Sequence, residues 1–366
     1  MQFHMPEYHH PDFTQEVFRK APDVTIKKAQ LDGVAPEYFH STSMYPEYFK
    51  IGGTWTLAKE SRMDSCVILR EDGSLDVVEA RNIKRGDRII LGRTERCEEG
   101  IFLHNRGFEE EETGIDDQFV FRQGRSRETS YARDYDKLFE LLKYEKAHAG
   151  RIVWVMGPAF AFDSDARNAM ASLIDHGYAQ AVMAGNALAT HDLEGAWLHT
   201  ALGQDIYTQR SQPNGHYHHL DVCNEVRRCG SIRQFITENE LNDGIICSCM
   251  RNNVPVVLAG SIRDDGPLPE VIGDAYQAAA AMREQLRDCT TVICLATMLH
   301  TIAAGNMTPS FRVLPDGTIR PVYFYAVDAD EFVVNKLLDR GSLSATTVVT
   351  NVQDFIMLVA RGLGVI

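Results

Sequence analysis

From residue 151 onward, short apolar runs rich in β-branched residues alternate with longer segments of helical periodicity. The runs lack polar alternation, which is typical of strands buried on both faces of a sheet. Because strand-helix alternation builds parallel sheets, the chain is expected to contain an α/β domain with a doubly wound, Rossmann-like parallel sheet. The expected strands are 153–156, 179–183, 254–259, 291–296, 322–327 and 345–349. The expected helices cover 134–148, 164–176, 187–202, 220–251, 269–287, 298–304, 331–340 and 352–363.

The first third of the chain has a different character. Short β-type runs at 55–57, 66–69, 76–78 and 88–91 are separated by Gly-Gly, Asp-Gly and Gly-Asp pairs. This spacing predicts a small antiparallel sheet or barrel, preceded by an extended arm with short elements over 1–50. The acidic run FEEEETGIDD at 108–117 is interpreted as a solvated linker. We therefore expect an N-terminal arm and β-rich domain at 1–117 and an α/β domain at 118–366.

Charge and hydropathy exclude several classes of function. The formal net charge is −14, whereas nucleic-acid binding needs Lys/Arg-rich faces that neutralise phosphates. No apolar run approaches the ~18 residues of a membrane span, and the N-terminus lacks the basic-then-apolar pattern of a signal peptide. We expect a cytoplasmic protein that binds neither nucleic acid nor membrane.

Cysteine and histidine spacing argues against a metal centre. The eight cysteines are scattered along the chain, so free thiols are expected. The segment His216-Tyr217-His218-His219, followed by Cys223, is compatible with a metal cluster. We instead expect these imidazoles to line a polar ligand site, and we predict no metal.

The residues that follow the expected strands indicate where a ligand binds. Each strand ends in a loop of Gly, Asn, Asp, His or Thr, and open α/β sheets bind ligands in the crevice outside these carboxyl ends. Small residues allow backbone N–H groups to approach a phosphate, and helix N-termini favour an anion. No G-x-G-x-x-G follows any of the strands, so the usual dinucleotide fingerprint is absent. These patterns alone indicate a polar cleft and do not name its ligand.

The stretch NVPVVLAGSIRDDGPLPEVIGD at 253–274 is the most informative of these loops. A buried strand turns through Gly260 and Ser261 and delivers Arg263, Asp264 and Asp265 to its carboxyl end. An ordinary polar Asp-Gly turn would have a similar sequence. The small or polar loops at the other strand ends favour the interpretation of Arg263, Asp264 and Asp265 as site residues.

Several of these segments resemble one family. The segments are APEYFHSTSMYPEYFKIGGTWTL (35–57), RMDSCVIL (62–69), AGNALATHDLE (184–194), GHYHHL (215–220), VPVVLAGSIRDDGPLPEVIGD (254–274), ATMLHTIAAGNM (296–307) and DRGSLSA (339–345). They resemble the archaeal-type ornithine cyclodeaminases, a LOR/SDH conserved-domain family that also forms the carboxyl-terminal half of bifunctional arginine dihydrolase/ornithine cyclodeaminases. A weaker resemblance, over 252–266 and 300–303, is to deoxyhypusine synthase, an NAD enzyme with a related sheet.

The resemblance implies an NAD-dependent enzyme that converts L-ornithine to L-proline and ammonia by borrowing and returning a hydride. It implies that Asp264 and Asp265 bind ammonium groups and transfer protons, that Arg263 holds the α-carboxylate, and that His219, His191 and His300 shuttle protons. The implied cofactor contacts are Gly157, Pro158, Ala159, Gly185, Asn186, Asp192, Gly260, Ser261, Thr297, His300, Asn306 and Asp328. His40, Ser41, Thr42, Arg62 and Asp64, in the family-like N-terminal stretch, are further candidates to reach the substrate.

The same resemblance implies a small amino-acid substrate and a homo-oligomer. Two alternatives stay open at this point. One is an NAD-dependent dehydrogenase or deaminase that acts on another amino acid or an opine. The other is a non-catalytic sensor of NAD or an amino acid, although the density of His, Asp and Arg at the strand ends favours an enzyme.

Overall fold

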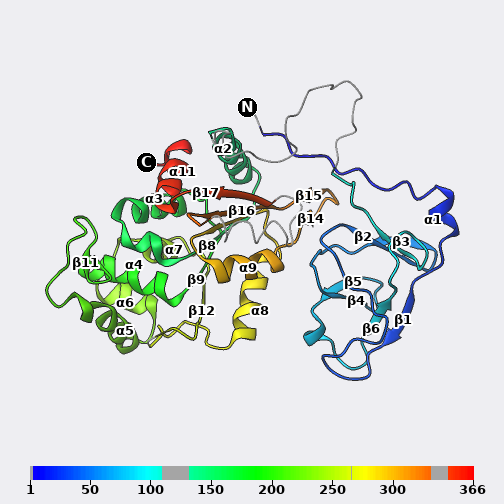
Figure 1. Cartoon of the computed structure of the whole chain (residues 1–366), viewed down its shortest axis with the longest axis horizontal. Helices are drawn as coiled ribbons and strands as arrows, with labels where there is room; N and C mark the ends of the chain where they lie inside the picture. The colour runs from blue at the N-terminus through cyan, green and yellow to red at the C-terminus, as the bar shows by residue number, and fades with distance from the viewer. Residues whose placement is uncertain (1–2, 109–131, 265, 331–344) are drawn as a thin grey trace.

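The structure, a computed structural model, describes residues 3–108, 132–264, 266–330 and 345–366. An α/β part and a smaller β-rich N-terminal part lie beside one another (Figure 1). The boundary expected at 117/118 and the helix expected at 331–340 lie outside the described residues, so both stay predictions.

A six-stranded parallel sheet forms the centre of the α/β part. Its strands are β8 (Ile152–Met156), β9 (Ala181–Gly185), β12 (Val256–Ala259), β13 (Thr291–Leu295), β16 (Tyr323–Asp328) and β17 (Ala345–Val349). All six were expected from the apolar runs, and the predicted α/β fold class is confirmed. In space the order is β12-β9-β8-β13-β16-β17, which is third, second, first, fourth, fifth and sixth along the chain. This is the order of dinucleotide-binding sheets, whose ligand crevice lies where the order reverses, here between β8 and β13.

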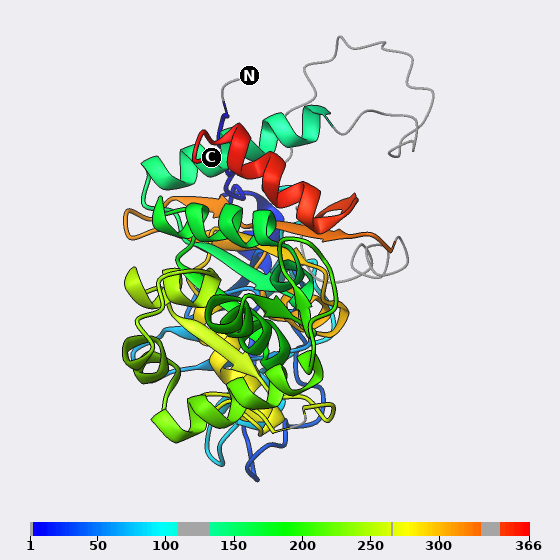
Figure 2. The same cartoon turned by 90° about the vertical axis from the view of Figure 1, so that its left-hand side faces the viewer.

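Alternate residues of each strand point to opposite faces of the sheet. Both faces are apolar, and helices cover both of them. In β8, Ile152, Trp154 and Met156 join one apolar core, whereas Val153 and Val155 join the other. The first core is closed by α2 (Ala132–Ala147), α3 (Ser164–Asp175), α4 (Asn186–Leu198), α5 (His218–Cys229), α6 (Ile232–Glu238), α7 (Ile245–Arg251) and α11 (Val352–Gly362). The second core is closed by α8 (Ala275–Leu286) and α9 (Met298–Met307), which lie on the side of the N-terminal part (Figures 1 and 2).

Two helix expectations need correction. The helix expected from 269 begins at Ala275, where the Asp274 side chain accepts a hydrogen bond from the Gln277 N–H. The residues before it run extended along β12, with Ile272 accepting from the Gly260 N–H and donating to Leu258. The helical span expected over 220–251 is three helices, because the chain turns with positive φ at Gly230 and Gly244.

The N-terminal part is antiparallel, as expected. One sheet has the order β1-β6-β4-β5 and the other β3-β2-β7. Four strands match the predicted runs, namely β3 (Thr54–Leu57), β4 (Cys66–Leu69), β5 (Leu75–Val78) and β6 (Arg88–Leu91). Three more strands were not predicted individually from the sequence, namely β1 (Thr25–Lys28), β2 (Glu47–Ile51) and β7 (Ile101–Leu103). The same holds for the short helix α1 (Glu16–Lys20).

Several sets of contacts join the two parts. Glu60 pairs with Arg283 of α8 and with Arg287, which directly follows this helix, at 3.2 Å in each case. The Ser61 hydroxyl contacts that of Ser310 at 2.9 Å, just before the hairpin of β14 (Phe311–Val313) and β15 (Ile319–Pro321). The N-terminal arm packs Phe3 against the rings of Tyr144 and Tyr323. The arm is therefore bound within its own chain along this stretch.

Two further observations concern the whole described chain. All eight cysteines are free and buried. Within residues 3–108, 132–264, 266–330 and 345–366, no helix has the length and apolar character needed to cross a membrane.

Candidate active site

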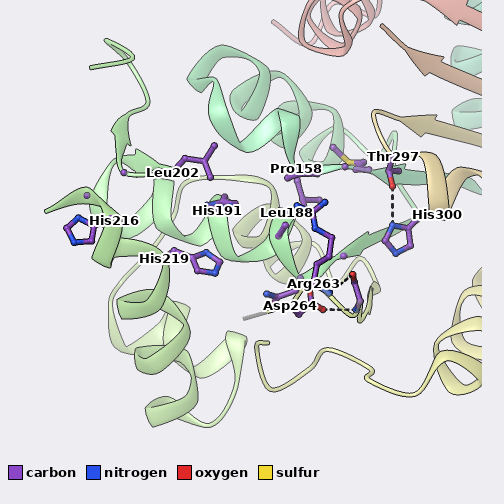
Figure 3. A pocket seen from close by; sticks show the side chains of 18 residues that line it. Pro158, Leu188, His191, Leu202, His216, His219, Arg263, Asp264, Thr297 and His300 are labelled. Atoms are coloured by element: carbon purple, nitrogen blue, oxygen red, sulfur yellow. Dashed lines mark hydrogen bonds between the residues drawn. The ribbon is translucent and has the colours of Figure 1, made fainter. Parts of the chain in front are cut away.

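A cavity of about 560 Å³ opens at the carboxyl edge of the parallel sheet (Figure 3). Ligand pockets for small molecules and cofactors commonly fall within roughly 300–1,000 Å³. Its walls come from the ends of β8, β9, β12 and β13, from α4, and from the segments before α5. The lining residues are Met156, Gly157, Pro158, Gly185, Asn186, Ala187, Leu188, His191, Leu202, Gly203, Gly215, His216, His219, Ser261, Arg263, Asp264, Thr297 and His300.

Gly157 occupies the point where the strand order reverses. A Cβ at this position would lie 1.9 Å from the carbonyl oxygen of Ala296, the residue that follows β13. Any side chain would therefore force the ends of β8 and β13 apart. The short 3₁₀ helix Pro158–Phe162 starts directly after Gly157.

Two helices begin at the cavity with no side-chain cap. Gly185, which has no side chain, precedes α4, and Thr297, whose side chain accepts no backbone hydrogen bond from the first turn, precedes α9. The first N–H groups of a helix have no partner within the helix and carry partial positive charge. By contrast, α3 and α8, whose starts do not line the cavity, are capped by Asp163 and Asp274. The cavity edge is therefore suited to an anionic group such as a phosphate.

The loop after β12 carries the charged residues of the cavity. The Ser261 N–H donates to Oδ2 of Asp264 at 2.8 Å, and the Arg263 N–H donates to the Ser261 hydroxyl at 3.1 Å. These bonds fix the loop while leaving the Arg263 guanidinium at the cavity, and within the described residues it forms no ion pair. Asp265 lies outside the described residues, so its predicted role is not addressed by the structure.

His300, in the first turn of α9, faces this loop across the cavity (Figure 3). Its Nδ1 lies 3.1 Å from the Thr297 hydroxyl. Burial lowers the pKa of His300 below its ordinary 6.5, and the opposing charge of Asp264 does not cancel this effect. The ring is therefore neutral at pH 7 and able to accept a proton.

A second imidazole, that of His191, lies on α4 next to a carboxylate that sequence reasoning missed. Its Nδ1 is 2.8 Å from Oε2 of the fully buried Glu194, and its ring lies 5.0 Å from that of His219. The signal in the sequence was the i, i+3 spacing of His and Glu, which places both on one helix face.

Ten of the residues assigned as site residues from the sequence come together at the cavity. They are Gly157, Pro158, Gly185, Asn186, His219, Ser261, Arg263, Asp264, Thr297 and His300, and His191, also expected to shuttle protons, joins them. Asn186 also has a structural task, since its side-chain oxygen accepts from the Leu268 N–H at 3.0 Å. Within the described residues, no group of three or more His, Cys, Asp or Glu side chains is arranged to hold a metal ion.

Asp192 is corrected from cofactor contact to core residue. It is fully buried and accepts from Nε of Arg167 at 2.9 Å. It also accepts from the backbone N–H groups of Ile245 at 3.1 Å and Ile246 at 2.8 Å, so it caps α7 from a distance. Its position on α4 points it away from the cavity and toward α3 and α7.

Four other assigned cofactor contacts do not line the cavity. Ala159 accepts from the Gln353 side chain, and the Gly260 N–H donates to Ile272. Asn306 lies exposed in the last turn of α9, and Asp328 ends β16, beyond the strands that form the cavity.

The N-terminal candidates also lie elsewhere. His40 pairs with the buried Glu47 at 2.9 Å, and Arg62 pairs with Glu79. Ser41, Thr42 and Asp64 do not line the cavity either.

Comparison with known proteins agrees with this geometry. The family model described as arginine dihydrolase ArgZ-like, C-terminal, Rossmann fold, matches residues 137–359. The ornithine cyclodeaminase of Methanocaldococcus jannaschii is 38% identical over 348 residues, which cover 93% of this chain and 78% of that protein.

Two solved structures are also similar. A putative LOR/SDH protein from Methanococcus maripaludis S2 has a TM-score of 0.83 and 33% identity, over 93% of this chain and 98% of that one. The ternary complex of AgrE with ornithine and NAD+ has a TM-score of 0.59 and 31% identity, over 94% of this chain and 46% of that one. The chain therefore belongs to the ornithine cyclodeaminase family, which it shares with the C-terminal Rossmann-fold region of the ArgZ-like arginine dihydrolases.

Proposed function

We propose that this protein is an NAD-dependent ornithine cyclodeaminase, which converts L-ornithine to L-proline and ammonia. The observation that carries the proposal is the convergence of Arg263, Asp264 and His300 on a cavity at the reversal point of a dinucleotide-type sheet. AgrE, which aligns with 94% of this chain, was crystallised with ornithine and NAD+.

The residues of the cavity fit NAD. The uncapped start of α4 offers backbone N–H groups to the pyrophosphate, and Gly157 lets the ends of β8 and β13 lie close together at the point where the strand order reverses. Pro158, Gly185, Asn186, Ser261 and Thr297 complete the proposed contact surface. Bound NAD supplies reversible hydride transfer.

The remaining charges fit a basic amino acid. We assign the α-carboxylate of ornithine to Arg263, whose guanidinium can donate two parallel hydrogen bonds. The δ-ammonium is assigned to Asp264, with Asp265 as the second carboxylate expected from the sequence. Because ammonium groups must lose protons before nitrogen can react, neutral imidazoles are needed nearby. Three imidazoles that line the cavity are candidates for this role, namely the neutral ring of His300 and the rings of His219 and His191.

Product stoichiometry tests the proposal. Purified protein supplied with NAD+ and L-ornithine is expected to release ammonia and proline in equal amounts without net formation of NADH. Accumulation of NADH in step with ammonia would instead indicate a dehydrogenase, and the same assay with other amino acids and opines would identify its substrate. Binding of NAD+ without turnover of any of these compounds would support the sensor.

We further propose that the enzyme is a cytoplasmic homo-oligomer acting in proline formation from arginine-derived ornithine. Exposed apolar side chains occur at and near the cavity lining: Leu202 lines the cavity, and Ile262, Leu299 and Tyr217 are sequence neighbours of residues that line it. Such side chains are suited to burial against a second copy. Sedimentation at micromolar concentration should give a mass above the 41.1 kDa of one chain, and a monomer would contradict this part.

A further inference from the structure

A chain of hydrogen-bonded side chains connects the active-site cavity to a second cavity on the outer side of α4 and α5. The second cavity, of about 520 Å³, is lined by Trp197, Leu198, His218, Asp221, Asn224, Glu225 and Arg228. His191 lines the first cavity and His218 lines the second. Between them lie Glu194 and Thr200, both buried.

The links are short and continuous. Oε2 of Glu194 lies 2.8 Å from Nδ1 of His191. Oε1 of Glu194 accepts from the Thr200 hydroxyl at 2.8 Å and from the Gly203 N–H at 3.2 Å. The Thr200 oxygen lies 2.7 Å from Nδ1 of His218. The two hairpin strands β10 (Thr200–Ala201) and β11 (Gln204–Asp205) hold Thr200 and Gly203 in place.

The protonation states follow from these contacts. Burial raises the pKa of Glu194, but the hydrogen bonds from His191, Thr200 and Gly203 outweigh this effect and hold the pKa below its ordinary 4.5. Glu194 is thus a carboxylate at neutral pH and can only accept, so Nδ1 of His191 must carry a proton. The single Thr200 proton is donated to Glu194, so Nδ1 of His218 must donate to Thr200. Nε2 is then the nitrogen of His191 available for proton exchange.

We infer that His191 is the general base of the cyclodeaminase reaction and that Glu194 is its positioning residue. Thr200, supported by His218, holds the Glu194 carboxylate in place. The inference rests on the proposed function. Nε2 of His191 takes one proton from the substrate α-ammonium: an N–H bond breaks, its electron pair stays on the substrate nitrogen, and an Nε2–H bond forms. The same proton passes to the departing ammonia when the Nε2–H bond breaks, which regenerates the neutral ring.

The carboxylate distinguishes His191 from His300. An imidazolium formed at His191 is stabilised by the negative charge of Glu194 at 2.8 Å. His300 has a hydroxyl at its Nδ1 instead, and its burial disfavours the charged ring. Among the described residues, the titratable groups that contact His191 are Glu194 on α4 and His219 on α5, while the 3₁₀ helix before α3 presents the ring of Phe162.

Glu194→Gln tests the inference, because it removes the charge and keeps the size. We expect kcat to fall on the order of 100-fold, the range of a general base that has lost its support, while KM for ornithine stays within about threefold. Glu238→Gln makes the same change in an exposed ion pair with Arg228 and should leave kcat unaltered.

A second pair of variants guards against misfolding. Thr200→Val removes the hydroxyl and should lower kcat about tenfold, whereas Thr200→Ser should stay near wild type. If Glu194→Gln does not fold, this pair decides. Wild-type kcat in Thr200→Val, or wild-type kcat in folded Glu194→Gln, would overturn the inference. Absence of cyclodeaminase activity in the unmodified protein would instead refute the proposed function, so the two failures are distinguishable.

Discussion

Replacing Asp192 by Asn should unfold the α/β part at a much lower temperature without weakening NAD binding to the folded protein. Asp192 has 0% side-chain exposure and its partner Arg167 has 1%, so the substitution leaves a buried guanidinium without its closest charge. The two carboxylate oxygens of Asp192 each accept from one backbone N–H, that of Ile245 or that of Ile246. The amide of Asn has one acceptor oxygen, so one of these two hydrogen bonds is lost. Breaking a buried pair in this way costs about 3–5 kcal/mol. For a unit of this size the expected fall in Tm is on the order of 10 °C.

The matched control is Asp243→Asn. Asp243 bonds the same Arg167, at 2.8 Å, but its side chain is 42% exposed, so the cost should not exceed about 1 kcal/mol. Calorimetric unfolding measures Tm, and titration calorimetry well below Tm measures NAD affinity. An Asp192→Asn protein with wild-type Tm and at least about tenfold weaker NAD binding would return Asp192 to the cofactor site and refute the reasoning.

Three further outcomes are expected. Gly157→Ala places a Cβ 1.9 Å from the Ala296 oxygen and should abolish NAD binding or folding, whereas Gly273→Ala, with no atom within 4 Å, should be silent by calorimetry. The folded state lowers the pKa of His300, so the contribution of this residue to stability is complete above pH 6.5 and is lost as the pH falls. Between about pH 7 and pH 5, the Tm of the wild type should therefore fall more than the Tm of His300→Gln. Arg263→Ala should raise KM for ornithine at least about tenfold, and Arg263→Lys less, in steady-state assays.

The central sheet could be predicted from the sequence because its signal is local. Each strand is a continuous apolar run, and burial on both faces requires that pattern. β2 shows where this reasoning ends. Its sequence EYFKI contains two charges, yet Glu47 and Lys50 are buried. They are satisfied by His40 and by the carbonyls of Phe18, Arg19 and Ala21, partners that only the folded structure brings together.

The candidate site was predictable to the extent that it lies at strand ends. Gly185 ends a strand, and Gly157, Ser261 and Thr297 lie one or two residues after one, so their convergence follows from the sheet. The sequence could not show which side of α4 faces the ligand, because ten of the thirteen residues of this helix are buried and no polar face marks its orientation.

Neighbouring residues of α4 consequently serve different purposes. His191 faces the cavity, whereas Asp192 turns to Arg167. Asn306 was misplaced for a different reason: α9 continues to Met307, which carries Asn306 to the end of the helix opposite the cavity.

The fate of the α-hydrogen of ornithine tests the central claim most directly. L-Ornithine labelled with deuterium at Cα is incubated with the protein and NAD+, and proline is examined by mass spectrometry. Internal return of the hydride predicts that proline retains the deuterium at the ring carbon bearing the carboxylate, with ammonia released in equal amount. Unlabelled proline, or deuterium that accumulates in reduced cofactor, would contradict the account.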